Sequence, residues 1–280
     1  MKSKTAVVTG SSGGFGLLIS LELALRGFYV VATMRNIEKG SELINKAKEM
    51  SLEQYIKLIE LDVTREDSIL TCKSYLEESC GSIDILVNNA GYAGAGFAEE
   101  VSIQEFRKQF ETNVFGVMSV TQAILPLMRR KKAGKIINMS SISGKIGFPG
   151  LSPYSASKHA LEGYSESLRL ELRDFGIDVV LVEPGSFKTN IWTTGKQVAE
   201  SSLNQNSPYF KMMERIEAHL HKASPRYGNP IDVARLIGDI AENPKPKLRY
   251  QIGKGVKATL ALKAILPWWI WEKLLLKQLK

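Results

Sequence analysis

The sequence of 280 residues predicts an α/β fold, a single domain built on a doubly wound parallel sheet. The first observation is that short apolar runs, typical of buried strands, alternate with helical segments as far as residue 182. The second is that the residues with chemical potential follow directly after these runs. In a parallel sheet with helices on both faces, those positions lie together at the carboxyl ends of the strands, where ligands bind.

The composition narrows the class of protein. A hydrophobic fraction of 44% is enough for a normal core, and the net charge of +8 permits attraction to anions such as nucleotide phosphates or acidic lipid headgroups. Cys72 and Cys80 suit neither a disulfide framework nor a metal site, so we expect no metal and a reducing, cytoplasmic location. We find no signal peptide, no apolar run of membrane-spanning length and no basic stripe interleaved with aromatic residues, so nucleic-acid binding is not expected.

The first strand and the turn after it predict a phosphate site. The run TAVVT at 5–9 is followed by GSSGGFG at 10–16 and by a helix that stops at Gly27. Glycines let the backbone approach a pyrophosphate, and the free N–H groups at the start of the helix attract its charge. The alternative is a plain tight turn.

The second strand, 28–33, ends where the ribose 2′ position is read in such folds. The residues there include Arg35 and no acid. A guanidinium suits a 2′-phosphate, whereas a carboxylate would bind the free hydroxyl of NAD, so the sequence favours NADP(H). The alternative is an ordinary surface arginine.

Two further strands, 55–61 and 83–87, are each followed directly by polar or small residues. A helix over 37–50 precedes the first of them, and one over 65–80 separates the two. Asp62 is expected either to accept from an adenine amine or to be a solvated turn aspartate beside an N-capping Thr64. The small residues of NNAG at 88–91 let a cofactor lie against the backbone, unless they form a simple loop.

A long helical stretch over 102–132 opens with a predicted capping box of Ser102 and Glu105. Asn113 lies inside it, and asparagine is unfavourable in the middle of a helix. It is expected to bond a local backbone carbonyl or to interrupt the helix and hold a water, the alternative being a solvent-facing side chain.

The strand over 135–139 delivers Ser140 and Ser141, and the next helix carries Tyr154 and Lys158 and ends at Gly176. A spacing of four puts the phenol and the ammonium on one helix face. We expect the lysine, with a cationic nicotinamide, to lower the pKa of the tyrosine and make it a proton donor and acceptor. Tyr250 and Lys254 repeat the spacing, but Gly253 between them argues against a helix. A sixth strand follows at 177–182.

At this point the sequence resembles the short-chain dehydrogenase/reductase family. The matching motifs, in order, are TGSSGGFG at 9–16, DVT at 62–64, NNAG at 88–91, Asn113, Ser141, YSASK at 154–158 and PGSFKT at 184–189. The resemblance implies a Rossmann-type fold and hydride transfer between NAD(P)(H) and a carbonyl or alcohol. It implies that Tyr154 is the acid/base, that Lys158 lowers its pKa and holds the nicotinamide ribose, that Ser141 orients the substrate oxygen and that Asn113 holds a proton-relay water. It also places a set of residues along the cofactor: Gly10, Ser12, Phe15, Gly16, Asp62, Val63, Asn89, Gly91, Pro184, Gly185 and Thr189.

Within that family the chain resembles the branch of 17β-hydroxysteroid and retinol dehydrogenases. The matching parts are VVATMRN, NVFGVMSVTQAILPLMR and the long C-terminal extension. Substrates vary widely in such a branch, so turnover of steroids or retinoids is not implied. The family commonly pairs through the two long helices on either side of the fifth strand, so a homodimer or homotetramer is expected.

The chain is thus expected to have four parts: a dinucleotide-binding and catalytic core over 1–190, a substrate lid over 191–228, a last helix and strand of the core over 229–254, and an amphipathic extension over 255–280. Trp192 and the Met212/Met213 pair suit either an adaptable lid or ordinary helix packing. The extension, with three tryptophans beside Pro267 and several lysines, suits packing or a lid over the cleft, or contact with a membrane surface.

The sequence therefore predicts an NADP(H)-dependent oxidoreductase that interconverts a hydrophobic ketone or aldehyde and its alcohol. Two alternatives remain open. One is a 3-oxoacyl-thioester reductase, although such enzymes are usually shorter and lack the extension. The other is a non-catalytic protein that binds NADP(H) as a redox signal.

Overall fold

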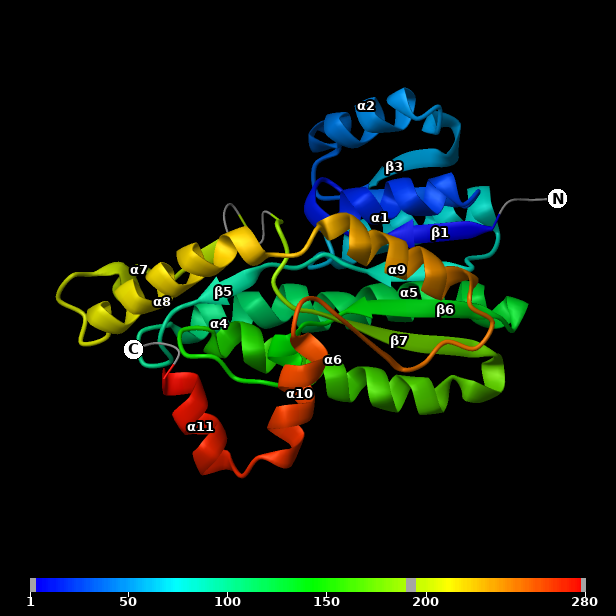
Figure 1. Cartoon of the computed structure of the whole chain (residues 1–280). Coiled ribbons are helices and arrows are strands. Elements are labelled where there is room, and N and C mark those ends of the chain that lie inside the picture. The colour runs from blue at the N-terminus through cyan, green and yellow to red at the C-terminus, as the bar shows by residue number, and fades with distance from the viewer. Residues whose placement is uncertain (1–3, 190–194, 278–280) are drawn as a thin grey trace.

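The computed structural model describes residues 4–189 and 195–277, so the expectation for Trp192 lies outside the described residues. Its centre is a sheet of seven parallel strands in the order β3-β2-β1-β4-β6-β7-β9 (Figure 1). The strands are β1 (Thr5–Val8), β2 (Tyr29–Met34), β3 (Ile56–Glu60), β4 (Ile85–Asn88), β6 (Gly134–Met139), β7 (Ile177–Pro184) and β9 (Arg249–Ile252). The predicted α/β class is confirmed, and β9 pairs with β7, so the segment after residue 229 returns to the same sheet.

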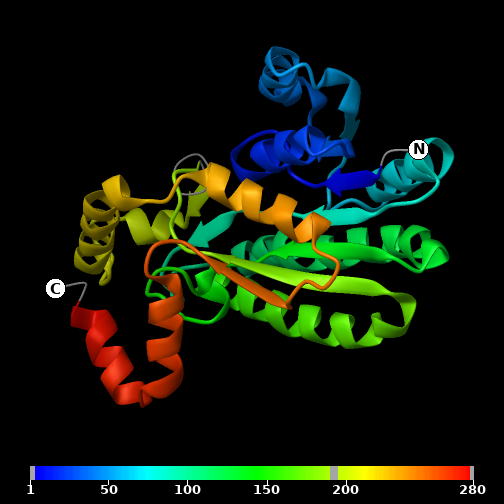
Figure 2. The ribbon, with the colours of Figure 1, turned by 45° about the vertical axis from the view of Figure 1, so that its right-hand side comes forward.

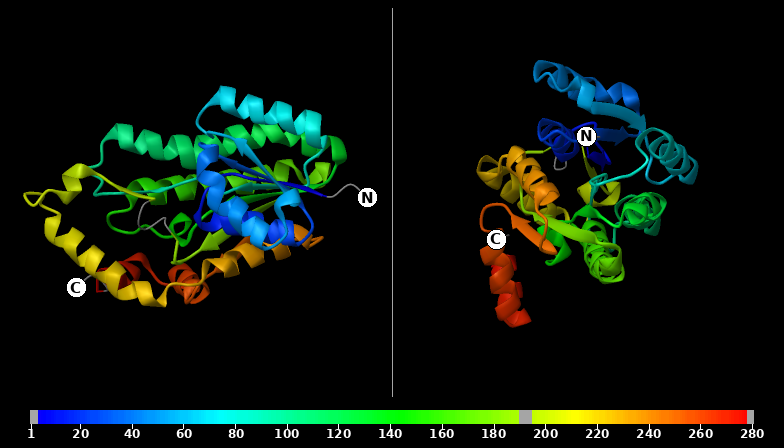
Figure 3. Two further views of the ribbon diagram at one scale, coloured as in Figure 1. Left: turned by 90° about the horizontal axis from the view of Figure 1, so that it is seen from above. Right: turned by 90° about the vertical axis from the view of Figure 1, so that its right-hand side faces the viewer.

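Helices cover both faces of the sheet, and a separate hydrophobic core fills each side (Figure 3). One face is covered by α1 (Gly14–Leu25), α2 (Ser41–Glu49) and α9 (Pro230–Glu242), and the other by α3 (Glu66–Tyr75), α5 (Gly116–Lys131) and α6 (Ser152–Glu171). Because β1 and β4 are buried on both sides, their sequences are apolar without alternation, apart from Thr5 at the start of β1 and Asn88 at the end of β4.

The winding direction reverses at β1. This strand pairs with β2 on one side and with β4 on the other. The loops after β1 and β4 therefore leave the sheet together, and the backbone N–H of Asn89 donates to Thr9 Oγ1 at 2.9 Å. This is the switch point at which doubly wound sheets bind ligands.

Several local expectations need correction. The stretch over 102–132 is not one α-helix: the predicted capping box starts α4 (Ile103–Phe110), and a π-helical turn, Glu111–Phe115, separates it from α5. Thr64 is not the N-cap of α3, because Arg65 holds that position without a side-chain cap. The sequence also gave no sign of the small parallel sheet of β5 (Ala93–Ala95) and β8 (Lys196–Val198), whose strands lie far apart in the chain.

The structure also contains several short helical turns. Another π-helical turn, Leu76–Cys80, ends the α3 segment, and 3₁₀ turns lie at Ile37–Gly40, Glu53–Tyr55, Ile142–Gly144, Arg173–Phe175 and Ser224–Arg226. Tyr250 lies in β9 and Lys254 in the turn after it, so the repeated spacing forms no helix, as predicted.

The remaining helices gather at the end of the molecule where the strands have their carboxyl ends (Figure 2). They are α7 (Glu200–Leu203), α8 (Phe210–Ala223), α10 (Val256–Ile265) and α11 (Trp268–Lys277). The last two form a hairpin that stands out from the sheet layers (Figures 2 and 3). Within the described ranges, no helix is both long and apolar enough to cross a membrane.

Candidate active site

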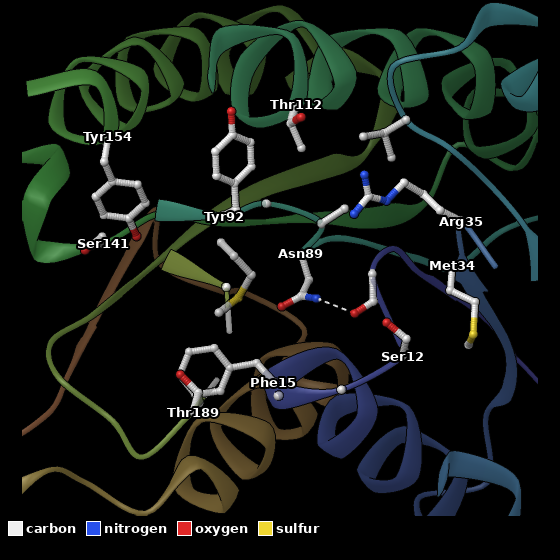
Figure 4. Close-up of a pocket in the computed structure, with 18 of the residues that line it drawn as sticks. Ser12, Phe15, Met34, Arg35, Asn89, Tyr92, Thr112, Ser141, Tyr154 and Thr189 are labelled. Carbon is white, nitrogen blue, oxygen red and sulfur yellow. Dashed lines mark hydrogen bonds between the residues drawn. The ribbon is translucent and has the colours of Figure 1, made fainter. Parts of the chain in front are cut away.

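A cavity of about 870 Å³ opens at the carboxyl ends of the strands. Tyr154 and Ser141 lie at one end of it and Met34 and Arg35 at the other, with Ser12 and Asn89 between them (Figure 4). The cavity thus runs from the proposed chemistry to the proposed 2′ position of a dinucleotide.

The turn after β1 is packed so tightly that only glycine fits at two of its positions. Gly10 has a φ of +71°, and a Cβ there would lie 2.8 Å from the Cα of Ala90. A Cβ on Gly16 would lie 2.2 Å from the carbonyl oxygen of Gly10 and 2.6 Å from Nδ2 of Asn89. The amide of Asn89 donates to the carbonyls of Thr9 at 2.8 Å and Gly10 at 3.2 Å. The loop after β4 therefore holds the glycine turn in shape.

The start of α1 has the features of an anion site. Its N-cap is Gly13, which offers no side-chain cap, and Ser12, Gly13 and Gly14 all line the cavity. The N–H groups of a first helical turn have no partner within the helix, so they present a partial positive charge toward the cavity. Arg35 adds a full positive charge. Its side chain is exposed, and in the described part of the chain no carboxylate forms an ion pair with it.

Asp62 also lines the cavity, where its Oδ1 accepts from the backbone N–H of Thr64 at 2.9 Å and from its hydroxyl at 2.7 Å. It is thus both a turn aspartate and a cavity residue, and the two expectations are compatible.

Tyr154, Lys158 and Ser141 converge on the cavity wall. Both Tyr154 and Lys158 lie in α6 and are buried, with the tyrosine 4% exposed. Lys158 Nζ lies 5.6 Å from the centre of the Tyr154 ring and donates to the carbonyl of Met139 at 2.7 Å. Ser141 starts the 3₁₀ turn after β6, where its hydroxyl accepts from the N–H of Ser143 at 3.1 Å and interacts with Tyr154. The turn between the serine and the tyrosine therefore folds back and brings the two side chains together.

Burial dominates the electrostatics of this group. Burial raises the pKa of Tyr154 to about 12, and the hydrogen bond with Ser141 works against it. Burial also lowers the pKa of Lys158 to about 8, although the negative charge of Glu162 opposes this. The expected lowering of the tyrosine pKa involves a cationic nicotinamide as well as the lysine, and it stays a prediction for the complex with the cofactor.

Asn113 lies behind the cavity rather than on its wall. It is 1% exposed and sits in the π-helical turn, so the solvent-facing alternative is wrong. Its Oδ1 accepts from the N–H of Tyr92 at 3.2 Å, and its Nδ2 donates to the carbonyl of Tyr92 at 3.1 Å and to Oγ of Ser157 at 3.4 Å. The carbonyl that it binds is thus remote in sequence, and the side chain ties the loop after β4 to α6.

Most predicted residues line the cavity. These are Gly10, Ser12, Phe15, Arg35, Asp62, Val63, Asn89, Gly91, Ser141, Tyr154, Lys158, Pro184, Gly185 and Thr189. Gly16 and Asn113 do not, and each instead supports a neighbour that does. Sequence reasoning missed further lining residues, among them Met34, Met139 and Tyr92. The first two end β2 and β6, and Tyr92 follows the NNAG motif, so position after a strand was the signal that could have found them.

A cluster of charges around the buried Glu162 and Glu183 also went unpredicted. Glu162 accepts from the hydroxyl of Ser140 at 2.5 Å and pairs with Lys145 Nζ and Arg249 Nε, both at 3.0 Å. Arg249 also pairs with Glu183 at 3.1 Å and with Glu166. Glu162 follows Lys158 by one helical turn, so the cluster supports the catalytic end of the cavity from behind. The described residues hold no cluster of His, Cys, Asp and Glu suited to a metal ion.

Comparison with known proteins identifies the family. The family model for short chain dehydrogenases matches residues 4–199. The chain is 48% identical to an uncharacterized oxidoreductase, YusZ, of Bacillus subtilis (strain 168), over 100% of this chain and 99% of that protein. It is 34% identical to retinol dehydrogenase 8 of Homo sapiens, over 94% of this chain and 85% of that one. The solved structure of ElxO with NADP bound superposes with a TM-score of 0.76 at 27% identity, over 91% of this chain and 99% of that one.

Proposed function

Because the chain belongs to the short-chain dehydrogenase/reductase family and is an oxidoreductase, we propose that it interconverts a hydrophobic ketone or aldehyde and its alcohol with NADP(H). The observation that carries the proposal is the convergence of Tyr154, Ser141 and Lys158 on the wall of a cavity that begins at the glycine turn.

The cavity suits NADP(H) on chemical grounds. The uncapped start of α1 suits the pyrophosphate, and the close approach at Gly10 leaves its backbone open to the cavity. Arg35, without a carboxylate partner in the described residues, suits a 2′-phosphate, and Lys158 suits the nicotinamide ribose. The NADP bound to ElxO supports this choice of cofactor. When bound, the nicotinamide supplies the hydride, and the protein supplies position and the proton.

In reduction, the hydroxyl of Tyr154 donates a proton to the carbonyl oxygen. Its pKa of about 12 keeps the phenol protonated at neutral pH, which is the form that a donor needs. Ser141, within reach of Tyr154, orients the substrate oxygen, and the Lys158 cation stabilises the phenolate that remains. Asn113 acts by fixing Tyr92 and Ser157, with a relay water as a further proposed role. The apolar surfaces of Met139, Tyr92 and Phe187 on the cavity wall support a hydrophobic substrate.

Replacement of Tyr154 by Phe tests the proposal. The oxidation of NADPH, followed by absorbance with a panel of aldehydes and ketones, should fall by about 10²-fold or more, since general acid catalysis contributes that much. NADPH binding should persist. Tyr164→Phe is a matched control, because Tyr164 is a partly buried tyrosine of the same helix that does not line the cavity.

The same experiment separates the alternatives. NADPH binding without turnover of any carbonyl would favour the redox-sensing protein, whereas turnover confined to 3-oxoacyl thioesters would favour the thioester reductase. Equal activity of Tyr154→Phe and the wild type would contradict the assignment of the acid.

For assembly and location, we propose a homo-oligomer through α5 and α6 and a cytoplasmic protein. The location rests on the sequence expectation of a reducing compartment, and both cysteines, Cys72 and Cys80, are buried.

A further inference from the structure

The C-terminal hairpin exposes its apolar side. Of the exposed residues of α10, five are Ala, Leu or Ile and one is Lys257. A helix that packs on its own protein shows the reverse pattern, with polar residues toward water. Trp268 and Trp269, at the start of α11, are 61% and 67% exposed.

Exposed apolar residues are concentrated here. The described chain has 16 large hydrophobic side chains that are exposed, and six of them lie between residues 256 and 277. They are Leu262, Ile265, Trp268, Trp269, Leu274 and Leu276. Single exposed hydrophobic residues are normal on a protein surface, but a cluster of this kind marks an interaction site.

The hairpin is anchored, but it is not a lid. Val256, which is buried, lies against Gly185 of the cavity wall, and Trp271 is buried as well. No described residue of α10 or α11 lines the cavity. The tryptophans at the joint between the two helices therefore cover neither the substrate nor the core, and Figures 2 and 3 show the hairpin reaching away from the sheet.

The charges around this surface indicate which kind of partner it binds. Between residues 254 and 277 there are five lysines, at 254, 257, 263, 273 and 277, against the single acid Glu272. Two copies that met through this face would bring these like charges together, within a chain that already carries a net charge of +8. An anionic lipid surface attracts the lysines, at roughly 1 kcal/mol for each near the surface, and accepts tryptophan at the headgroup level.

We propose that the α10–α11 hairpin docks on the surface of an anionic lipid bilayer, with Trp268, Trp269 and Ile265 entering the headgroup region. The hairpin lies in the interface and does not span it. Because α10 begins at the cavity wall, docking holds the catalytic cavity beside the bilayer. The inference does not depend on the proposed reaction, since the hairpin carries none of the residues that line the cavity.

Flotation of the full chain with vesicles tests the proposal. The protein should float with vesicles of phosphatidylcholine and phosphatidylglycerol in equal parts, much less with phosphatidylcholine alone, and less at high salt. Trp268→Ser/Trp269→Ser should weaken the binding on the order of 100-fold, from the apolar surface that no longer enters the interface. Leu170→Ser is the matched control: Leu170 is 75% exposed on α6, away from the hairpin, and its loss should leave flotation unchanged.

Two further measurements test whether the tryptophans and the lysines of the hairpin contact the lipid. Brominated lipids should quench the tryptophan fluorescence of the wild type, and the quenching should be lost in the double variant. Lys257→Gln/Lys273→Gln, which leaves every apolar residue in place, should weaken binding to the anionic vesicles by about 10-fold or more. Turnover of a water-soluble carbonyl should be the same in all of these variants, so a failure of docking is separate from a failure of the proposed reaction.

Three results would overturn the proposal. The first is wild-type protein that stays unbound with both kinds of vesicle. The second is vesicle binding that survives the loss of both tryptophans. The third is a tryptophan-dependent dimer, measured by light scattering, in protein that does not bind vesicles, because the hairpin would then pair with a second copy of the chain.

Discussion

Replacement of Arg35 by Ala should remove most of the preference for NADPH over NADH. Arg35 lies at the end of the cavity opposite Tyr154 (Figure 4), and its exposed side chain has no carboxylate partner in the described residues. The substitution therefore breaks no ion pair, and we expect the free energy of unfolding to stay unchanged. The substitution should therefore weaken only the binding of the nucleotide that carries a 2′-phosphate.

The size of the effect follows from the exposure of the site. A hydrogen bond to a charged group is worth about 1.5–3 kcal/mol. Because Arg35 is exposed and salt screens such a pair, the lower half of that range applies, and the Kd for NADPH should rise by about 10- to 45-fold. The Kd for NADH should change by less than about 2-fold, since no charge faces the guanidinium in that complex.

The assay is a fluorescence titration of the wild type and the variant with each nucleotide, at low and at moderate salt. Arg65→Ala is the matched control, because Arg65 is an exposed arginine at the same edge of the sheet that pairs with Asp67 and does not line the cavity. A wild type that prefers NADH, or an Arg35 variant that binds NADPH as tightly as the wild type, would refute the argument for the 2′-phosphate.

Two further substitutions test the packing and the electrostatics of the cavity. Gly16→Ala places a methyl group 2.2 Å from the carbonyl oxygen of Gly10. We expect thermal unfolding to show a loss of about 1–3 kcal/mol of stability, and we expect NADPH to bind more weakly. An unchanged Tm would contradict the tight packing at Gly16. The reduction rate of the wild type should fall as the pH rises through about 8, because Lys158 loses its proton there. In Glu162→Gln this fall should occur at lower pH, because the carboxylate of Glu162 favours the lysine cation in the wild type. Glu166→Gln is the control for that profile, and coincident profiles of the three proteins would argue against the role of Glu162.

Most of the fold could be predicted because its central strands are buried on both sides. A strand such as β1 must then be a short apolar run, and the turn chemistry that follows it is local as well. The same holds for the site residues that directly follow strands, such as Ser141 and Asp62. Their place in the sequence fixes their place at the edge of the sheet before any tertiary contact is known.

What escaped prediction depends on contacts between distant parts of the chain. Asn113 binds the backbone of Tyr92, 21 residues away, and Arg249 reaches Glu162 across 87 residues. The pairing of β5 with β8 joins segments about a hundred residues apart, and no periodicity marks it. The direction of the apolar face of α10 was left open by the sequence, because the same spacing of Leu and Ala describes a helix that packs inward and one that faces outward.

The protonation state of Tyr154 also depends on contacts with distant parts of the chain, and it bears directly on function. The sequence predicts a lowered pKa from the lysine together with a cationic nicotinamide, whereas in the protein alone burial by the surrounding elements raises the pKa to about 12. The phenol is then protonated at neutral pH. The protein alone therefore holds a proton donor, which suits reduction of a carbonyl. Oxidation of an alcohol needs the phenolate, and hence a further positive charge beside the ring, such as that of the oxidised nicotinamide. The burial of α6 thus supports the role of proton donor that we propose for Tyr154 in reduction.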